Sequence, residues 1–217
     1  MAYRSFGRVW QVSAPATIRR LLRPHHPFSS IAQALDRIGQ PSERLRRLLT
    51  AVRSGDPDNR EAQAAQAYWP LMMGRDFRRD RGADGANAML NYGYAVLRAA
   101  TVRAIVSAGL HPSLSVHHRS GGDALALADD LMEPFRSTVD LIVHRLRAEG
   151  RACVEDARED LVACLSADFP TRNGATPLSQ VLVRLAQSLA RSFLDRKLKL
   201  DFPSRPLPDV VGETEHA

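Results

Sequence analysis

The sequence predicts an all-α protein, and three observations support that fold class. Alanine, leucine and arginine, which favour helices, are abundant, whereas aromatic residues make up only 6% of the chain. Apolar residues recur at spacings of three and four over long segments, which is the period of an amphipathic helix. No segment of useful length alternates apolar and polar residues in the way a half-buried strand does. With 44% apolar residues in 217, the chain can build one hydrophobic core.

The first helices are expected after an irregular basic arm at residues 1–28, which several prolines interrupt. Ser29 can cap a first helix that ends at Gly39. A second helix is expected at about 42–53. A third should begin with Asp56 as its cap and Pro57 in its first turn, and should run to about Met73.

Two long helices form the expected centre of the bundle. The first should be capped by Asp84 and run to about Ala108, with apolar residues on two sides, which is typical of a central helix. The second should run from Asp123 to about Glu149. Helices at about 154–166 and 177–199 complete a helical domain over 29–200. Residues 201–217 are expected to be a Pro-rich tail, extended and then partly disordered.

The positive charge is concentrated at the N-terminus. Residues 1–53 contain ten arginines against Asp36 and Glu43, a net charge of +8, whereas the whole chain carries +6. Such a block suits an anionic polymer, although an arginine-rich arm without a specific ligand is an equal alternative. The two cysteines form no CxxC pair, and no secretory signal or membrane-spanning segment is evident. A cytoplasmic protein is therefore the expectation.

Two carboxylates three residues apart form the first part of a candidate metal site. Asp130 and Glu133 should share one side of a helix, with Cβ atoms roughly 5–6 Å apart, so that both can bind one cation. The alternative is a solvated acidic face, because both point away from the expected core. His118 precedes this helix in a loop and can fold back to add a nitrogen ligand, but it can equally be a surface residue.

Glu61 is the second part of the candidate site. Its helical neighbours include Ala64, Ala65, Tyr68 and Met72, so this face should be buried, where a carboxylate needs a metal or a salt-bridge partner. Nearby arginines offer contacts to phosphate, and asparagines on the next helix add polar donors. The candidate DNA-binding residues are Arg75, Arg78, Arg79, Asn87 and Asn91.

Several ordered motifs resemble one family, the CRISPR-associated integrase/endonuclease (Cas-one), in the form that accompanies type II systems. The matching segments cover residues 54–69, 77–79, 87–99, 109–112, 117–119, 127–136 and 139–140. The resemblance extends from about Ser30 to Pro208 and implies a helical catalytic domain. It implies Glu61, His118 and Glu133 as metal ligands and catalytic residues, with Asp130 and His117 beside them.

The resemblance also implies the reaction and the partners. The cofactor would be Mg²⁺ or Mn²⁺, and the partners would be prespacer and repeat DNA and a small ferredoxin-like subunit, Cas-two. A DNA 3′-hydroxyl would attack a phosphodiester of the CRISPR repeat during spacer acquisition, and members of the family work as homodimers. Members also begin with a β-rich domain that these residues do not contain, and Ser115 replaces a common glycine. We therefore expect the metal site to form but integration to be weak or absent.

Two alternatives remain at this point. The chain can be a truncated, inactive remnant that binds DNA or the partner subunit without chemistry. It can also be a metal hydrolase unrelated to nucleic acids.

Overall fold

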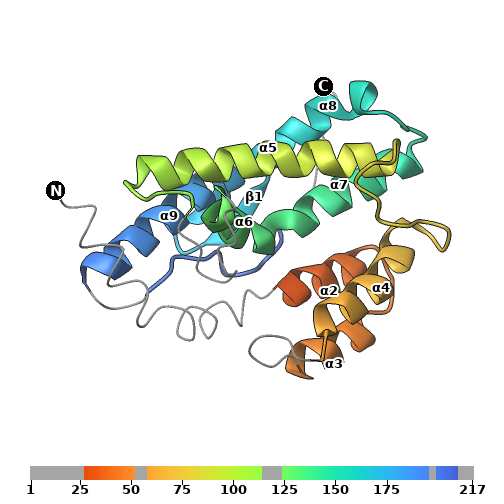
Figure 1. Cartoon of the computed structure of the whole chain (residues 1–217), viewed down its shortest axis with the longest axis horizontal. Helices are drawn as coiled ribbons and strands as arrows, with labels where there is room; N and C mark the ends of the chain where they lie inside the picture. The colour runs from red at the N-terminus through yellow and green to blue at the C-terminus, as the bar shows by residue number, and fades with distance from the viewer. Residues whose placement is uncertain (1–26, 52–57, 114–123, 196–198, 210–217) are drawn as a thin grey trace.

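The computed structural model describes residues 27–51, 58–113, 124–195 and 199–209. The described chain is mostly helical, and the all-α prediction is confirmed. Figure 1 shows the long helix α5 crossing the molecule beside α7 and α9, with α2, α3 and α4 gathered on one side. The elements, in order, are α2 Pro27–Arg37, α3 Glu43–Ala51, α4 Arg60–Met73, α5 Ala86–Ser107, α6 Ala126–Met132, η2 Glu133–Phe135, α7 Arg136–Ala148, α8 Val154–Ala163, η3 Cys164–Ser166, β1 Asp168–Thr171, β2 Gly174–Pro177 and α9 Leu178–Leu194.

The second long helix, predicted as continuous, is interrupted by the 3₁₀ turn η2. Pro134 explains the interruption, because proline lacks an N–H group and its ring crowds the carbonyl four residues earlier. The chain tightens over Glu133–Phe135 and then continues as α7. Glu133 therefore lies where the helix changes its pitch, and not within a regular α-helical turn.

Two predicted helix starts differ from those in the structure, and the predicted cap of a third helix lies outside the described residues. The first helix begins at Pro27, so Ser29 lies inside its first turn and is not its cap. Gly85 occupies the N-cap of α5 with a φ of 65°, a conformation that favours glycine, so the prediction of Asp84 was wrong. The predicted cap of the third helix, Asp56, lies outside the described residues, and α4 begins at Arg60.

A small antiparallel hairpin was not predicted. Strands β1 and β2 pair Phe169 with Thr176 and Thr171 with Gly174, between the helices expected at about 154–166 and 177–199. Each strand has four residues, which is too short for an alternation of apolar and polar residues to be recognised. Phe169 packs edge-on against Phe135 of η2, with 5.5 Å between ring centroids, so the hairpin closes one end of the core.

The final described segment lies along this hairpin. The N–H groups of Ser204 and Asp209 donate to the carbonyls of Pro170 and Asp168, at 2.8 and 3.0 Å. The N–H of Asp201 donates to the Ser188 hydroxyl of α9 at 2.9 Å. Hydrogen bonds thus fix residues 199–209 to β1 and α9.

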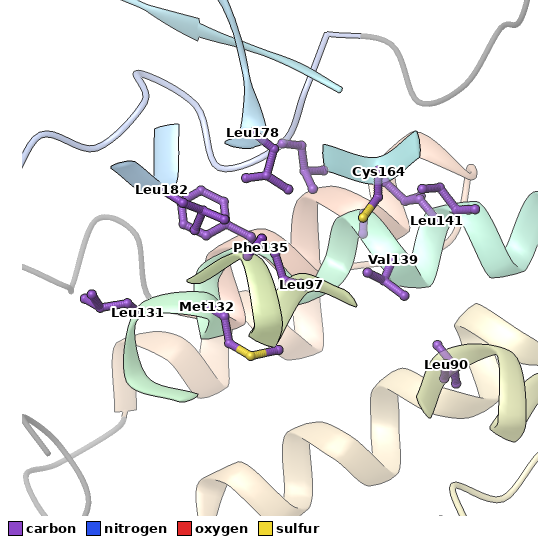
Figure 2. Close-up of a cluster of buried hydrophobic side chains, with 14 of the residues drawn as sticks. Leu90, Leu97, Leu131, Met132, Phe135, Val139, Leu141, Cys164, Leu178 and Leu182 are labelled. Atoms are coloured by element: carbon purple, nitrogen blue, oxygen red, sulfur yellow. The ribbon is translucent and has the colours of Figure 1, made fainter. Parts of the chain in front are cut away.

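The core surrounds α5, which packs against α6, α7, α8 and α9. Figure 2 shows part of it, where Leu97 of α5 lies near Phe135, Val139 and Leu182. At Gly93 the backbone of α5 approaches α7 so closely that a Cβ would lie 2.4 Å from Val139 Cγ1. This contact lets the neighbouring residues, Tyr94 and Asp140, meet. No helix in the described part of the chain is long and apolar enough to cross a bilayer.

Candidate metal and DNA site

A buried carboxylate, Asp140, lies at the meeting point of α4, α5 and α7. The Tyr68 hydroxyl of α4 donates to one of its oxygens at 2.7 Å. The Tyr94 hydroxyl of α5 donates to the other at 2.5 Å. Asp140 is only 2% exposed and Tyr68 only 3%. One carboxylate therefore joins three helices through two hydrogen bonds, of which one is buried and the other partly buried.

Burial controls the ionisation of this group. It raises the pKa of Asp140 to about 6, although the two tyrosine hydroxyls and the guanidinium groups of Arg136 and Arg79 oppose the rise. Burial and the neighbouring carboxylate raise the pKa of Tyr68 and Tyr94 well above their ordinary value. Both phenols therefore keep their protons at neutral pH and act as donors to Asp140.

Two guanidinium groups lie over the Tyr94 ring. The Cζ atom of Arg136 is 5.4 Å from the ring centroid, and that of Arg79 is 5.8 Å away. Both distances are within the range for a cation–π contact. Arg79 comes from the segment after α4 and Arg136 from the start of α7. The Tyr94 ring thus contacts two positively charged side chains that are distant from each other in the sequence.

The predicted Asn87 and Asn91 hold Arg79 and its segment in place. Arg79 donates to Asn87 Oδ1 at 2.9 Å and to Asn91 Oδ1 at 2.6 Å. Asn87 Nδ2 donates to the Arg78 carbonyl at 3.0 Å, and Asn91 Nδ2 donates to the Arg81 carbonyl at 2.8 Å. Direct DNA contact stays a prediction for these asparagines, whose side chains hold the arginine segment in its folded position. Arg75 and Arg78 are exposed.

The predicted acidic residues Asp130 and Glu133 lie at the junction of α6 and η2. Asp130 is 5% exposed, so the expectation of a solvated acidic face does not hold for it. Its neighbour Asp129 instead pairs with Arg98 of α5 at 2.5 Å. Glu133 is one-third exposed, and its Oε2 lies 3.1 Å from Nε of Arg136. This Nε is shielded from water and makes no hydrogen bond within the described part of the chain, so the contact is an ion pair without a hydrogen bond at that atom.

Three contacts between α4 and α7 advance along both helices in the same direction. Tyr68 meets Asp140 across 72 residues, and the Met72 carbonyl meets Nδ1 of His144 at 2.7 Å, also across 72 residues. Arg147 donates to the Met73 carbonyl, across 74 residues. Glu61 precedes Tyr68 by seven residues, and Glu133 likewise precedes Asp140 by seven. Glu61 lies within α4, whereas Glu133 lies in η2 before the start of α7, so these contacts do not extend to the pair.

Two of the three predicted metal ligands have side chains that lie outside the described part of the structure. Glu61 lies within α4, but its side chain is outside the described part, as are His117 and His118. Among the side chains that are described, no group of three His, Cys, Asp or Glu residues is arranged to hold a metal. The predicted ligand set thus stays a prediction.

The sequence analysis missed the roles of Asp140, Tyr68 and Arg136. Asp140 stands between apolar residues in the segment Val-Asp-Leu-Ile-Val, and an acid in such a run indicates a buried, hydrogen-bonded carboxylate. Tyr68 was placed correctly on a buried face. Its contact with a residue 72 positions away was not evident, because only the register of two packed helices produces it.

Comparison with known proteins identifies the family. The model of the family "CRISPR associated protein Cas1" matches residues 13–169. This chain belongs to the Cas1 family. The protein "CRISPR-associated endonuclease Cas1" of Neisseria meningitidis serogroup C is 46% identical over 114 residues, covering 52% of this chain and 37% of the relative. A second such protein, from Pyrobaculum aerophilum, is 32% identical over 158 residues, covering 70% of this chain and 53% of the relative.

Solved structures share the fold. A casposase bound to integration product superposes with a TM-score of 0.69 and 25% identity, over 86% of this chain and 65% of the other. A Cas1 protein from Thermotoga maritima gives 0.67 at 15% identity, over 82% and 65%. A partial Cas6-RT-Cas1–Cas2 complex gives 0.66 at 18%, over 83% and 67%. This chain spans about a third to a half of the two curated Cas1 relatives and about two thirds of these structures.

Proposed function

We propose that this chain carries the helical catalytic part of a Cas1 integrase/endonuclease and acts on DNA with a divalent metal during CRISPR spacer acquisition. The observation that carries the proposal is the Tyr68–Asp140 hydrogen bond between α4 and α7. It joins the helix that carries Glu61 to the helix that follows Glu133. Carboxylates that share a site repel each other, and a cation bound by both removes the repulsion.

The residues present fit Mg²⁺ or Mn²⁺. Carboxylate oxygens from Glu61 and Glu133 with an imidazole nitrogen from His118 are a donor set that these ions accept. Asp130, whose carboxylate is buried in the turn before Glu133, would orient the ligands, and so would His117 beside His118. A bound ion would supply Lewis-acid stabilisation of the negative charge that develops on the phosphoryl oxygens.

The arginines around Tyr94 have a separate task in the proposed reaction. In strand transfer, a DNA 3′-oxygen bonds to phosphorus while the bond to the leaving strand breaks, so that negative charge accumulates at the phosphate. Arg136, which lies beside Glu133, and Arg79, which lies over the same Tyr94 ring, would bind the phosphate through their N–H donors. The exposed Arg75 and Arg78 would hold the DNA backbone farther from the reacting bond.

The proposed partners follow from the relatives. A Cas1–Cas2 complex among the structures of the same fold supports a Cas2 subunit as partner, and the casposase with integration product supports DNA as substrate. The identity of 46% to the Neisseria meningitidis relative supports the type II-like form. We propose that the full assembly contains a Cas1 homodimer, as the family resemblance implies.

Metal binding provides the first test. Titration calorimetry of the 217-residue chain with Mn²⁺ is expected to give one site per chain, and Glu133→Ala or Glu61→Gln should weaken it by at least about tenfold. Glu159→Ala, at an exposed carboxylate of α8, is the matched control and should bind Mn²⁺ normally. A chain that binds DNA but no Mn²⁺ would contradict the proposal of a metal-dependent enzyme and would favour the inactive remnant.

DNA processing provides the second test. We expect cleavage of branched DNA in Mn²⁺ but not in EDTA, and loss of cleavage in Glu133→Ala. DNA binding in EDTA should weaken in Arg78→Ala, with the slope of log affinity against log salt reduced by about 1. Arg191→Ala, at an exposed arginine of α9, should leave that slope unchanged. Equal loss in both arginine variants would contradict a DNA surface at the segment after α4.

A further inference from the structure

Asp140 is connected to Glu133 by a chain of three contacts. Its carboxylate accepts the Tyr94 hydroxyl at 2.5 Å, and the Tyr94 ring lies 5.4 Å from the Arg136 guanidinium. Nε of Arg136 lies 3.1 Å from Glu133 Oε2. On its other side, Asp140 accepts the Tyr68 hydroxyl, which belongs to the helix that carries Glu61. Asp140 is thus linked through side-chain contacts to Glu133 and to the helix that carries Glu61.

We propose that Asp140, through Tyr94 and Tyr68, is a positioning residue that sets where Glu133, Arg136 and α4 lie relative to one another. Asp140 itself would contact neither the metal nor DNA, because its carboxylate is buried and each of its oxygens accepts a tyrosine hydroxyl. The inference rests on the proposed function, since the ligands it positions are those of the Cas1 site.

The geometry argues against a role in stability alone. Burying a carboxylate is unfavourable, and a neutral or apolar group of similar size commonly stabilises a core as well or better. The specific property of the carboxylate is that it offers an acceptor oxygen to each of two hydroxyl groups, on two different helices. An asparagine retains the shape but has a single acceptor oxygen. It therefore cannot hold both tyrosines in the observed arrangement.

A substitution at Tyr94 provides a second, independent test of the same contacts. Phenylalanine at this position keeps the ring under Arg79 and Arg136 but removes the hydroxyl that fixes the ring to Asp140. If the hydroxyl matters for positioning, Tyr94→Phe should lower metal affinity even though both cation–π contacts remain possible. Tyr92 is the matched control, because it is half-buried two residues away on α5 and carries Arg158 over its ring at 5.9 Å.

The experiment compares Asp140→Asn, Tyr94→Phe, Tyr68→Phe and Tyr92→Phe with the wild-type chain. Mn²⁺ affinity is measured by calorimetry at pH 7.5, and the melting temperature by circular dichroism without metal. The first three variants are expected to bind Mn²⁺ about tenfold or more weakly, as for other groups that orient metal ligands. Tyr92→Phe should match the wild type. In DNA cleavage, the loss should appear in kcat, with KM for DNA changed by less than about threefold.

The outcomes separate the inference from the proposed function. Normal Mn²⁺ affinity in folded Asp140→Asn and Tyr94→Phe overturns the positioning role and leaves the function intact. A wild-type chain that binds no Mn²⁺ overturns the function, and the positioning role with it. If the variants melt at a lower temperature but bind Mn²⁺ normally while folded, the hydrogen bonds of Asp140 contribute to stability only, and the positioning role is overturned. Should Asp140→Asn not fold, Tyr94→Phe and Tyr68→Phe decide, because each removes only one hydroxyl.

Discussion

Gly93 of α5 lies so close to Val139 of α7 that any side chain at Gly93 would collide with it. A Cβ there would lie 2.4 Å from Val139 Cγ1 and 3.3 Å from Leu161 Cδ2. Leu161 belongs to α8, so three helices meet at this point. The residues that follow, Tyr94 and Asp140, form the hydrogen bond at the centre of the candidate site. The close approach and the buried network therefore depend on one another.

Gly93→Ala is expected to destabilise the protein. Alanine favours the helix by about 1 kcal/mol over glycine, but the collision forces α5 and α7 apart, and such overpacking typically costs about 1–3 kcal/mol or more. Urea unfolding measures the difference. Adding Val139→Ala should recover part of the loss, giving a favourable coupling energy in a double-mutant cycle. An alanine at Gly93 that stabilises the chain by itself would contradict the observed contact.

Asp140 should make stability depend on pH in a defined direction. Burial raises its pKa to about 6, from 3.8 in an exposed carboxyl, so the folded state binds the proton more tightly than the unfolded state. The contribution of the protonated group is fully present below about pH 4 and is lost as the pH rises through 6. Two pKa units correspond to about 3 kcal/mol.

The comparison with Asp140→Asn isolates this effect. Its free energy of unfolding relative to the wild type should rise by about 3 kcal/mol between pH 4 and pH 7 and then level off. Burial keeps the pKa of Tyr68 and Tyr94 well above this range, so neither hydroxyl titrates in it. Urea unfolding at several pH values measures the difference. A difference that is flat from pH 4 to 7 would show that Asp140 has an ordinary pKa.

Much of the fold could be predicted from the sequence because it depends on local periodicity. Residues such as Leu97, Met132 and Leu146 repeat at helical spacing, and all three are buried. The break at Pro134 was missed because the apolar pattern continues through it on both sides. The hairpin was missed because its strands are four residues long and are held by Phe169 against Phe135, a contact that no local pattern reveals.

The candidate site was less predictable, because its contacts depend on how helices that are distant in the sequence pack against one another. Asp140 contacts Tyr68 from 72 residues away and Tyr94 from 46 residues away, and both contacts exist only once α4, α5 and α7 have packed. The acid in an apolar run was the one available signal. Asn87 and Asn91 were recognised as polar residues on α5, but their partners in the arginine segment depend on how that segment folds back.

Asn87 should control the order of the arginine segment. Its side chain accepts from the Asp80 N–H and from Arg79, both at 2.9 Å, and donates to the Arg78 carbonyl at 3.0 Å. Each such bond contributes about 1 kcal/mol, so Asn87→Ala should open the segment about tenfold or more often. Limited trypsin digestion, followed by mass spectrometry, should show faster cleavage at Arg75, Arg78 and Arg81.

The matched control for this variant is Asn173→Ala, at an exposed residue of the hairpin turn. It should leave cleavage between Arg75 and Arg81 unchanged. Faster cleavage throughout the chain in Asn87→Ala would indicate global unfolding, and a melting curve separates this from local opening. Unchanged cleavage in a folded Asn87→Ala would mean that Asn91 alone holds the segment.

The two cysteines should differ sharply in reactivity, which tests the packing of α8 and η3. Burial raises the pKa of Cys164 to about 12, so its thiolate is scarce at pH 8. Cys153 is half-exposed and donates to Asp156 at 3.0 Å, a hydrogen bond that raises its pKa but leaves it accessible. A disulfide reagent such as DTNB should therefore modify one thiol in the native chain and two in denaturant. Cys153→Ser should abolish the native reaction, whereas rapid labelling of native Cys153→Ser would show that Cys164 is not buried.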